Sequence, residues 1–144
     1  METESKRKKI ILVEDDQQLL EVYRQMFSGC DYDIEVATSA DQISEELRLI
    51  RTGASVKPDL IMMDLMLPYA NGEQVLKSIK KSYHTKDIPV FVLSNYQNPD
   101  LHKSLESQNI FPEKYLIKSN YTPAEIIGLV NQHFSSGRPK TSLS

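Results

Sequence analysis

The chain has 144 residues, a length that predicts one domain able to bury a core without disulfides or a structural metal. Its composition is 40% hydrophobic and 26% charged with a net charge of −3, which is typical of a soluble globular protein and does not favour a nucleic-acid binder. Cys30 is the only cysteine, so an internal disulfide is excluded and the reducing cytoplasm is the expected compartment. No apolar stretch approaches the roughly 18 residues of a membrane span, and the N-terminus lacks the apolar core of a signal peptide.

Residues 1–8 are polar, and a run of basic side chains leads into the first apolar segment. We expect a flexible, solvated lead-in here, with a nucleic-acid contact as the less favoured alternative. Residues 135–144 are also polar and are predicted to form a flexible tail. The folded domain is therefore predicted over residues 9–134.

Between these ends, short apolar runs alternate with segments of helical periodicity, and the alternation predicts five strands and five helices. The predicted strands cover Lys9–Val13, Asp33–Ala37, Pro58–Asp64, Ile88–Leu93 and Lys114–Ile117. The predicted helices follow the strands in turn, and they carry apolar residues over Leu19–Phe27, Ile43–Ile50, Val75–Ile79, the segment after Asn98, and Ile126–Phe134.

Local signals mark the helix ends. Ser28-Gly29 is expected to close the first helix, since glycine tolerates the left-handed cap conformation. Ser39 and Gly53 are the predicted start and stop of the second helix. The other predicted helix starts are Asn71 as a cap, Asn98-Pro99 and Thr122-Pro123.

Strands alternating with helices predict a three-layer α/β domain, a doubly wound (βα)5 fold with a five-stranded parallel sheet. Because crossovers are right-handed, covering both faces requires the strand order to reverse once, and the order 2-1-3-4-5 is the common solution at this size. That order places the ligand crevice between the ends of the first and third strands. Glu14 and Asp15 follow the first strand and Asp64 ends the third, so the motif and the topology select the same place.

Polar side chains suited to phosphoryl chemistry end four of the predicted strands: Glu14, Asp15, Asp64, Ser94 and Lys118. Three neighbouring carboxylates repel each other by roughly 4 kcal/mol per pair at about 4 Å and an effective dielectric near 20, so they require a divalent cation unless a proton is shared. Oxygen ligands without His or Cys predict Mg²⁺ or Mn²⁺ rather than zinc. Asp64 can then attack a phosphoryl donor, while the Lys118 ammonium and the Ser94 hydroxyl contact phosphoryl oxygens.

Five motifs carry a resemblance to a known family. They are Leu12–Asp16 (LVEDD), Asp64–Pro68 (DLMLP), Asn71-Gly72, Pro89–Ser94 (PVFVLS) and Tyr115–Lys118 (YLIK). Together they make residues 8–134 resemble the receiver domain of two-component response regulators, which has a flavodoxin-like, CheY-like fold.

The resemblance implies a role for each acidic residue of the site. Asp64 would be the phosphoacceptor. Asp15 would bind Mg²⁺ directly, and Glu14 would do so largely through water. The backbone carbonyl of Met66 would be a further metal ligand.

The resemblance also implies the parts of a switch. Ser94 would be the switch hydroxyl and Lys118 the phosphate-pairing lysine. Tyr115 would be the aromatic residue that turns inward when the hydroxyl engages phosphate, and the alternative for it is an edge-strand aromatic half packed on the surface. Ser119 departs from the family, because a proline usually follows the lysine, and we expect a trans bond and a different loop shape there. Tyr96 and Met66 flank the path of a hydrolytic water, and we hypothesise that they modulate the lifetime of the phosphoryl group.

The implied function is a signalling switch rather than an enzyme, with at most self-catalysed phosphorylation and dephosphorylation. Its phosphoryl donor would be a histidine kinase or a phosphotransfer protein. Its output would be a protein target that contacts the fourth helix, the fifth strand and the fifth helix. Neither nucleic acid nor membrane is expected as a direct partner, and the expected state is a monomer or a weak phosphorylation-dependent dimer.

Two other functions stay open at this point. A pseudo-receiver would bind partners without being phosphorylated, but every expected acidic residue and the lysine are present. A phosphatase of the haloacid dehalogenase type needs Asp-x-Asp after its first strand, where this chain has Glu14-Asp15-Asp16, and a cap for which there is no room. The chain is expected to be a single-domain regulator or a piece of a longer one.

Overall fold

The structure is a computed structural model that describes residues 7–67, 70–95 and 99–136. For Ala70, Asn71, Pro99, His102 and Ser136 it describes the backbone alone. The predictions for Pro68, Tyr96 and Asn98, for the capping side chain of Asn71, and for segments 1–6 and 137–144 therefore lie outside what is described.

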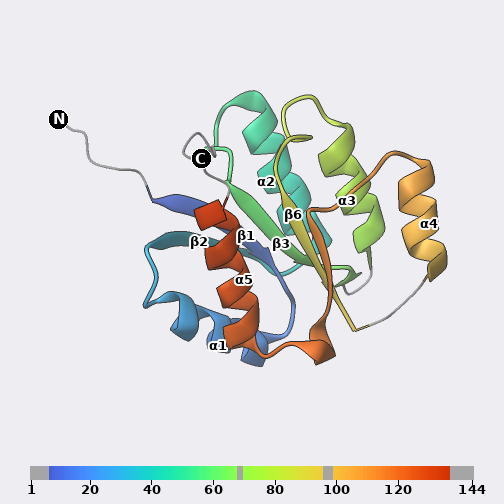
Figure 1. Cartoon of the computed structure of the whole chain (residues 1–144). Helices are drawn as coiled ribbons and strands as arrows, with labels where there is room; N and C mark the ends of the chain where they lie inside the picture. The colour runs from blue at the N-terminus through green and yellow to red at the C-terminus, as the bar shows by residue number, and fades with distance from the viewer. Residues whose placement is uncertain (1–6, 68–69, 96–98, 137–144) are drawn as a thin grey trace, which may run out of the picture.

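A five-stranded parallel sheet forms the middle layer of the domain, and helices cover both of its faces (Figure 1). The strands of this sheet are β1 (Lys8–Val13), β2 (Tyr32–Ala37), β3 (Leu60–Asp64), β6 (Val90–Ser94) and β7 (Lys114–Ile117). The helices are α1 (Gln17–Phe27), α2 (Ala40–Thr52), α3 (Gly72–Lys81), α4 (Pro99–Ser107) and α5 (Pro123–Ser136). A short hairpin of β4 (Met66–Leu67) and β5 (Ala70–Asn71) and a 3₁₀ turn η1 (Lys118–Asn120) complete the described elements.

The sheet order is β2-β1-β3-β6-β7, with every neighbouring pair parallel. This confirms the predicted order 2-1-3-4-5, because β6 and β7 are the fourth and fifth strands of the main sheet once the hairpin is set aside. The reversal of order lies at β1 and β3, so their carboxyl ends border the crevice.

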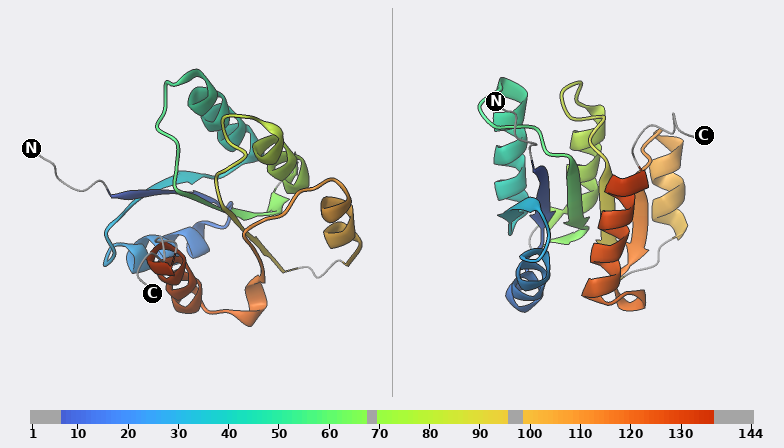
Figure 2. Two further views of the ribbon diagram at one scale, coloured as in Figure 1. Left: turned by 45° about the horizontal axis from the view of Figure 1, so that its top comes forward. Right: turned by 60° about the vertical axis from the view of Figure 1, so that its left-hand side comes forward.

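Alternate residues of the strands pack into two separate cores, one on each side of the sheet. Ile11, Met63 and Val92 belong to the core that α2, α3 and α4 cover. Leu12 and Phe91 belong to the opposite core, which α1 and α5 cover. Figure 2 shows the two helical layers separated by the sheet. Because both faces are buried, β3 and β6 are apolar up to their last residues, Asp64 and Ser94, which is why they were recognisable in the sequence.

The predicted ends of α2 are confirmed, and α1 ends at Phe27, just before Ser28-Gly29 as predicted, but the left-handed cap expected there is wrong. The Ser39 side chain accepts a hydrogen bond from the backbone N–H of Gln42, and Gly53 ends α2 in the left-handed conformation with φ of 85°. Gly29 is not left-handed, because Gly53 is the one glycine with positive φ within the described residues. The helical turn instead continues through Ser28, whose φ is −61°, so no left-handed residue is needed to end α1.

Several other boundaries differ by one or two residues. β1 and β2 each begin one residue earlier than predicted, and β3 begins two residues after Pro58. Pro89 precedes β6, so its missing N–H falls just outside the described strand, and its carbonyl oxygen accepts from the Ile61 N–H at 3.0 Å. α5 extends to Ser136, two residues beyond the predicted end of the domain.

The hairpin that follows β3 was not predicted from the sequence. The Gly72 N–H donates to the carbonyl oxygen of Leu65 at 3.2 Å, which closes the loop beside Asp64. A Cβ at Gly72 would lie 2.5 Å from that same oxygen and 2.6 Å from the Leu65 Cα. Only glycine therefore permits this close approach of the two backbones.

No helix within the described ranges combines the length and the apolar character that crossing a bilayer requires.

Candidate functional site

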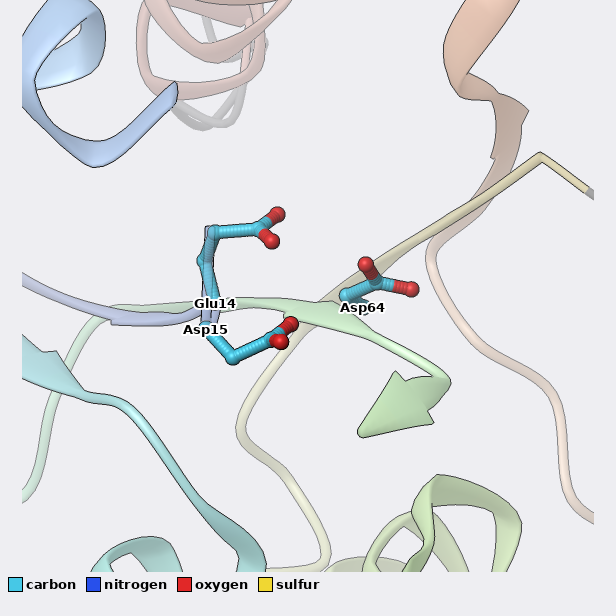
Figure 3. A group of neighbouring side chains, drawn as sticks. All are labelled: Glu14, Asp15 and Asp64. Atoms are coloured by element: carbon cyan, nitrogen blue, oxygen red, sulfur yellow. The ribbon is translucent and has the colours of Figure 1, made fainter. Parts of the chain in front are cut away.

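Three carboxylates meet at the carboxyl ends of β1 and β3. One oxygen each from Glu14, Asp15 and Asp64 lies within 4.8 Å of the others. Figure 3 shows the three side chains converging on one space. Glu14 is 1% and Asp64 5% exposed, whereas Asp15 is more accessible. The sequence prediction that these acids assemble at the crevice is thus borne out by the geometry, although they come from strands separated by some fifty residues of chain.

Lys118 reaches the same place from the end of β7. Its ammonium nitrogen lies 2.8 Å from Asp64 Oδ2 and 2.9 Å from Glu14 Oε1. The side chain of Lys118 is itself only 14% exposed. The lysine therefore partly neutralises two buried carboxylates that would otherwise face each other.

Backbone N–H groups hold the remaining carboxylate oxygens. The Met66 N–H donates to Asp64 Oδ1 at 2.9 Å, and the Asp16 N–H donates to Glu14 Oε2 at 3.1 Å. Asp64 is fixed through both of its oxygens in this way. Met66 places its side chain outward, where it is 63% exposed, so its backbone rather than its side chain faces the acidic residues.

The burial of the site shifts the protonation of its members. Burial raises the pKa of Glu14, with a further rise from Asp64, and the hydrogen bonds from Lys118 and the Asp16 amide only partly oppose this. Burial alone would lower the pKa of Lys118, but its hydrogen bonds and charge attraction to Asp64 and Glu14 outweigh that and raise it. The raised pKa of Lys118 keeps it charged, whereas the raised pKa of Glu14 reflects the cost of holding its negative form in a buried place.

Ser94 and Tyr115 lie one and two strands away from Asp64. Ser94 ends β6 and is 2% exposed. Tyr115 lies on the neighbouring β7 and packs against the core under α2, α3 and α4. Burial raises the pKa of the Tyr115 hydroxyl, and a hydrogen bond with Ser94 partly opposes the rise. Tyr115 is thus partly buried on the terminal strand of the sheet, with its hydroxyl oxygen shielded from solvent, and its role as the switch aromatic stays a prediction.

Sequence reasoning missed two features of the site. Asp16 is the N-cap of α1. Its side chain accepts hydrogen bonds from the N–H groups of Gln18 and Leu19, so it caps the helix.

The second feature is Tyr23, which was taken for an apolar position of α1. It is buried, and burial together with the charges of Glu14 and Asp64 raises its pKa to about 12 despite the opposing charge of Lys118. Because Tyr23 occurs at helical spacing among apolar residues, the sequence did not reveal that it lies close enough to feel the charges of the site.

The donor set fits a hard divalent cation. It consists of three carboxylates without a histidine or cysteine, which suits Mg²⁺ or Mn²⁺ rather than zinc. Two of the three carboxylates are buried, so water cannot screen their repulsion well. Cation binding and ion pairing with Lys118 are two ways to compensate the same charge.

A family model and a curated relative both relate this chain to response regulators. Residues 10–130 match the model of the response regulator receiver domain. The response regulator Rcp1 of Synechocystis sp. is 32% identical over 115 residues, which cover 78% of this chain and 77% of Rcp1. Two further curated relatives are longer, and the chain spans 36% and 33% of them.

Two solved structures that resemble this chain are also of response regulators. The crystal structure of the phosphorylated cyanobacterial phytochrome response regulator RcpA has a TM-score of 0.74 at 26% identity and covers 93% of this chain and 98% of that chain. The Mn²⁺-bound form of response regulator Rcp1 has a TM-score of 0.72 at 26% identity and covers 95% of this chain and 99% of that chain.

Proposed function

Since this chain belongs to the family of response regulator receiver domains, we propose that it is a phosphorylation switch in which Asp64 accepts the phosphoryl group. The observation that carries the proposal is the double contact of Lys118, at 2.8 Å from Asp64 and 2.9 Å from Glu14. An acceptor carboxylate, an acidic partner and a cation from three separate strand ends face one another. Such an arrangement serves to attract a phosphoryl group and balance its charge.

Glu14, Asp15, Asp64 and the Met66 carbonyl would hold Mg²⁺ or Mn²⁺, with Glu14 acting largely through water. The bound cation would neutralise charge on the phosphoryl oxygens during transfer. Two observations support this assignment. The three carboxylate oxygens lie within 4.8 Å of one another, and a relative of the same fold, Rcp1, is described in an Mn²⁺-bound form.

The contacts that hold Asp64 suit its carboxylate to accept a phosphoryl group. A carboxylate oxygen of Asp64 attacks the phosphorus atom of a phosphohistidine on a histidine kinase or phosphotransfer protein. The new O–P bond forms as the N–P bond breaks, and the electron pair of that bond leaves with the imidazole nitrogen, which takes a proton. The Met66 N–H and Lys118 keep the attacking group in a single orientation, since each binds one of its oxygens.

The phosphoryl group would then act on Ser94, Tyr115 and Lys118. It adds a charge of about −1.5 to −2 and strong acceptor oxygens. Lys118 would shift from Glu14 toward a phosphoryl oxygen, and the Ser94 hydroxyl would donate to another. Shifting a population from 1:99 to 99:1 needs about 5.5 kcal/mol, and two charge-assisted hydrogen bonds at about 1.5–3 kcal/mol each are of that order.

The readout surface is proposed to be α4, β7 and α5, which bring the change at Tyr115 to a downstream protein target. Tyr115 connects this surface to the site because it lies on β7, which pairs with β6, the strand that Ser94 ends. The domain would act as a monomer or as a weak dimer that forms on phosphorylation. Its place in the cytoplasm and the extent of the domain over 9–134 stay predictions.

The test is incubation with acetyl phosphate and Mg²⁺, followed by intact mass measurement. We expect one phosphoryl adduct that is stable to acid and labile to base. The adduct should be absent in Asp64→Asn and strongly reduced in Asp15→Asn. Asp41→Asn is the matched control because Asp41 is an exposed acid on α2, so this variant should be labelled like the wild type.

A wild-type chain that takes up no phosphoryl group under these conditions would leave a pseudo-receiver as the better description. An adduct that persists in Asp64→Asn would place the acceptor elsewhere. Catalytic turnover of free phosphomonoesters would instead favour the phosphatase alternative.

A further inference from the structure

The outer edge of β2 presents backbone hydrogen-bonding groups that no described strand covers. β2 is the terminal strand in the order β2-β1-β3-β6-β7, and Figure 1 shows it at the margin of the sheet. The Ala37 carbonyl oxygen accepts from the Glu14 N–H at 3.0 Å, so the backbone groups of Ala37 face β1. Because successive residues of a strand alternate in direction, those of Ile34 and Val36 face outward. An exposed strand edge is a template for the addition of an extended chain.

A hollow lies beside this edge, between β2 and α2. Its volume is about 420 Å³, and its floor includes Ile11, Val36 and Ala37. A second hollow of about 1000 Å³ continues toward the start of β2 and shares Glu35 with the first. Space for added side chains therefore lies beside Ile34 and Val36, whereas the outward carbonyl oxygen of Tyr32 already accepts a hydrogen bond from Arg7 at 2.9 Å.

The walls of the smaller hollow are acidic. They carry four carboxylates: Glu35, Asp41, Glu45 and Glu46. Two cations lie among them, since Lys9 is 3.5 Å from Glu35 and Arg48 is 2.6 Å from Glu45. Four negative charges against two positive ones leave an excess of two negative charges around the smaller hollow. The larger hollow carries both signs, since Arg7, Lys8, Lys9 and Lys57 line it together with Asp33, Glu35 and Asp59.

We propose that the β2 edge binds an extended segment of a partner protein that carries Lys or Arg at alternate positions. Side chains at i and i+2 of an added strand lie about 6.6 Å apart on one face. Asp41 and Glu45 lie one helical turn apart, about 5–6 Å between their Cβ atoms. The two spacings match, so successive cations of the segment can each meet a carboxylate of α2.

The intervening residues of the segment should be apolar. They would point to the opposite face of the sheet, where the side chains of Ile34 and Val36 are only partly buried against the core under α1 and α5. β-Branched residues suit that position, because they pack well on a half-buried pleated surface. The recognised pattern is therefore basic and apolar residues in strict alternation.

Charge argues against a second copy of this chain as the occupant. Asp33 and Glu35 are both exposed on β2, so pairing two β2 edges would set carboxylates against carboxylates. The proposed edge is also independent of the phosphoryl site, because none of the groups that would contact the segment belongs to that site.

The experiment uses the full chain and the peptide Lys-Val-Lys-Val-Lys-Val-amide with fluorescein on its N-terminal amine, so that every lysine side chain stays charged, and binding is measured by fluorescence anisotropy at low salt. We expect saturable binding that shifts the amide NMR signals of Ile34 and Val36. The double variant Asp41→Asn, Glu45→Gln should bind the peptide about 2- to 25-fold more weakly than the wild type. The matched control Glu21→Gln with Glu106→Gln removes the same charge from exposed positions on α1 and α4 and should leave binding unchanged.

Two further peptides separate strand addition from simple charge attraction. The same peptide N-methylated at alternate residues on its pairing side loses backbone donors and should bind at least about fivefold more weakly. A peptide of the same composition with its lysines in one block should also bind more weakly. Equal binding of these peptides, equal losses in both double variants, or no saturable binding would overturn the proposal. A dimer in sedimentation that the Asp41→Asn, Glu45→Gln variant disrupts would assign the edge to a second copy and overturn it as well.

Discussion

Replacing Lys118 with methionine should destabilise the cation-free domain and make it depend on a divalent cation. Lys118 pairs with Glu14 and Asp64, whose side chains are only 1% and 7% exposed. Methionine preserves most of the volume of the side chain but removes the ammonium group. Two buried carboxylates would then lack their shared positive partner.

The expected loss can be worked out from the geometry. At the 4.8 Å limit that separates the carboxylate oxygens, two unit charges repel by about 3.5 kcal/mol at an effective dielectric of about 20. Removing one partner of a buried pair costs about 3–5 kcal/mol in other proteins. We therefore expect Lys118→Met to lower the free energy of unfolding by about 3–5 kcal/mol in the absence of a cation. The loss should shrink as the pH falls through the raised pKa of Glu14, because the protonated carboxyl no longer repels Asp64.

The assay is urea unfolding at neutral pH, with EDTA or with Mg²⁺. A cation present at 100 times its dissociation constant stabilises by about 2.7 kcal/mol. The gain from Mg²⁺ should be larger in Lys118→Met than in the wild type, since the lysine no longer competes for the carboxylates. Lys77→Met is the matched control. Lys77 forms a partly exposed ion pair with Glu73 at 3.4 Å on α3, and its loss should cost no more than about 0.5 kcal/mol.

A Lys118→Met variant within about 1 kcal/mol of the wild type in EDTA would refute this reasoning. So would an equal gain from Mg²⁺ in the two proteins, because the lysine and the cation would then not be acting on the same charge.

Three further changes test other parts of the structure. Gly72→Ala should lower the free energy of unfolding in urea by about 3 kcal/mol and weaken Mg²⁺ binding, because the new Cβ overlaps backbone atoms beside the hairpin. Gly128→Ala has nothing within 4 Å of its new Cβ and should instead raise the free energy of unfolding by about 0.5–1 kcal/mol. Equal effects of the two glycine changes would contradict the close approach at the hairpin. Since the folded pKa of Tyr23 is raised from 10 to about 12, its contribution is complete below pH 10 and is lost as the pH rises toward 12. Tyr23→Phe should therefore remove up to about 2.7 kcal/mol of the alkaline loss in stability, and an unchanged alkaline unfolding profile would count against it. Ser39→Ala should cost about 1 kcal/mol through the lost helix cap, measured by thermal unfolding, while Ser44→Ala on the exposed face of the same helix should cost nothing.

The sequence by itself was enough for the order of strands and helices and for most of the helix ends. Ser39, Gly53 and Pro123 act through backbone geometry and local hydrogen bonds, which depend on a few neighbouring residues. The apolar runs also identified the buried strands, so the residues that follow them could be assigned to one edge of the sheet. Gly29 shows the limit of such signals, because a glycine after a helix permits a left-handed residue without requiring it.

The tertiary structure decided how the assembled residues meet. Lys118 is 54 residues from Asp64 and 104 from Glu14 along the chain, and no local pattern specifies that it bonds to both. The contact of Gly72 with Leu65 and the place of Tyr23 behind the site depend likewise on how a loop and a helix pack against the sheet. Sequence alone determined which chemical groups stand at the strand ends, since strand limits are set by local periodicity. Their distances, burial and shared charge were decided only when the crossovers brought distant segments together in a low-dielectric space.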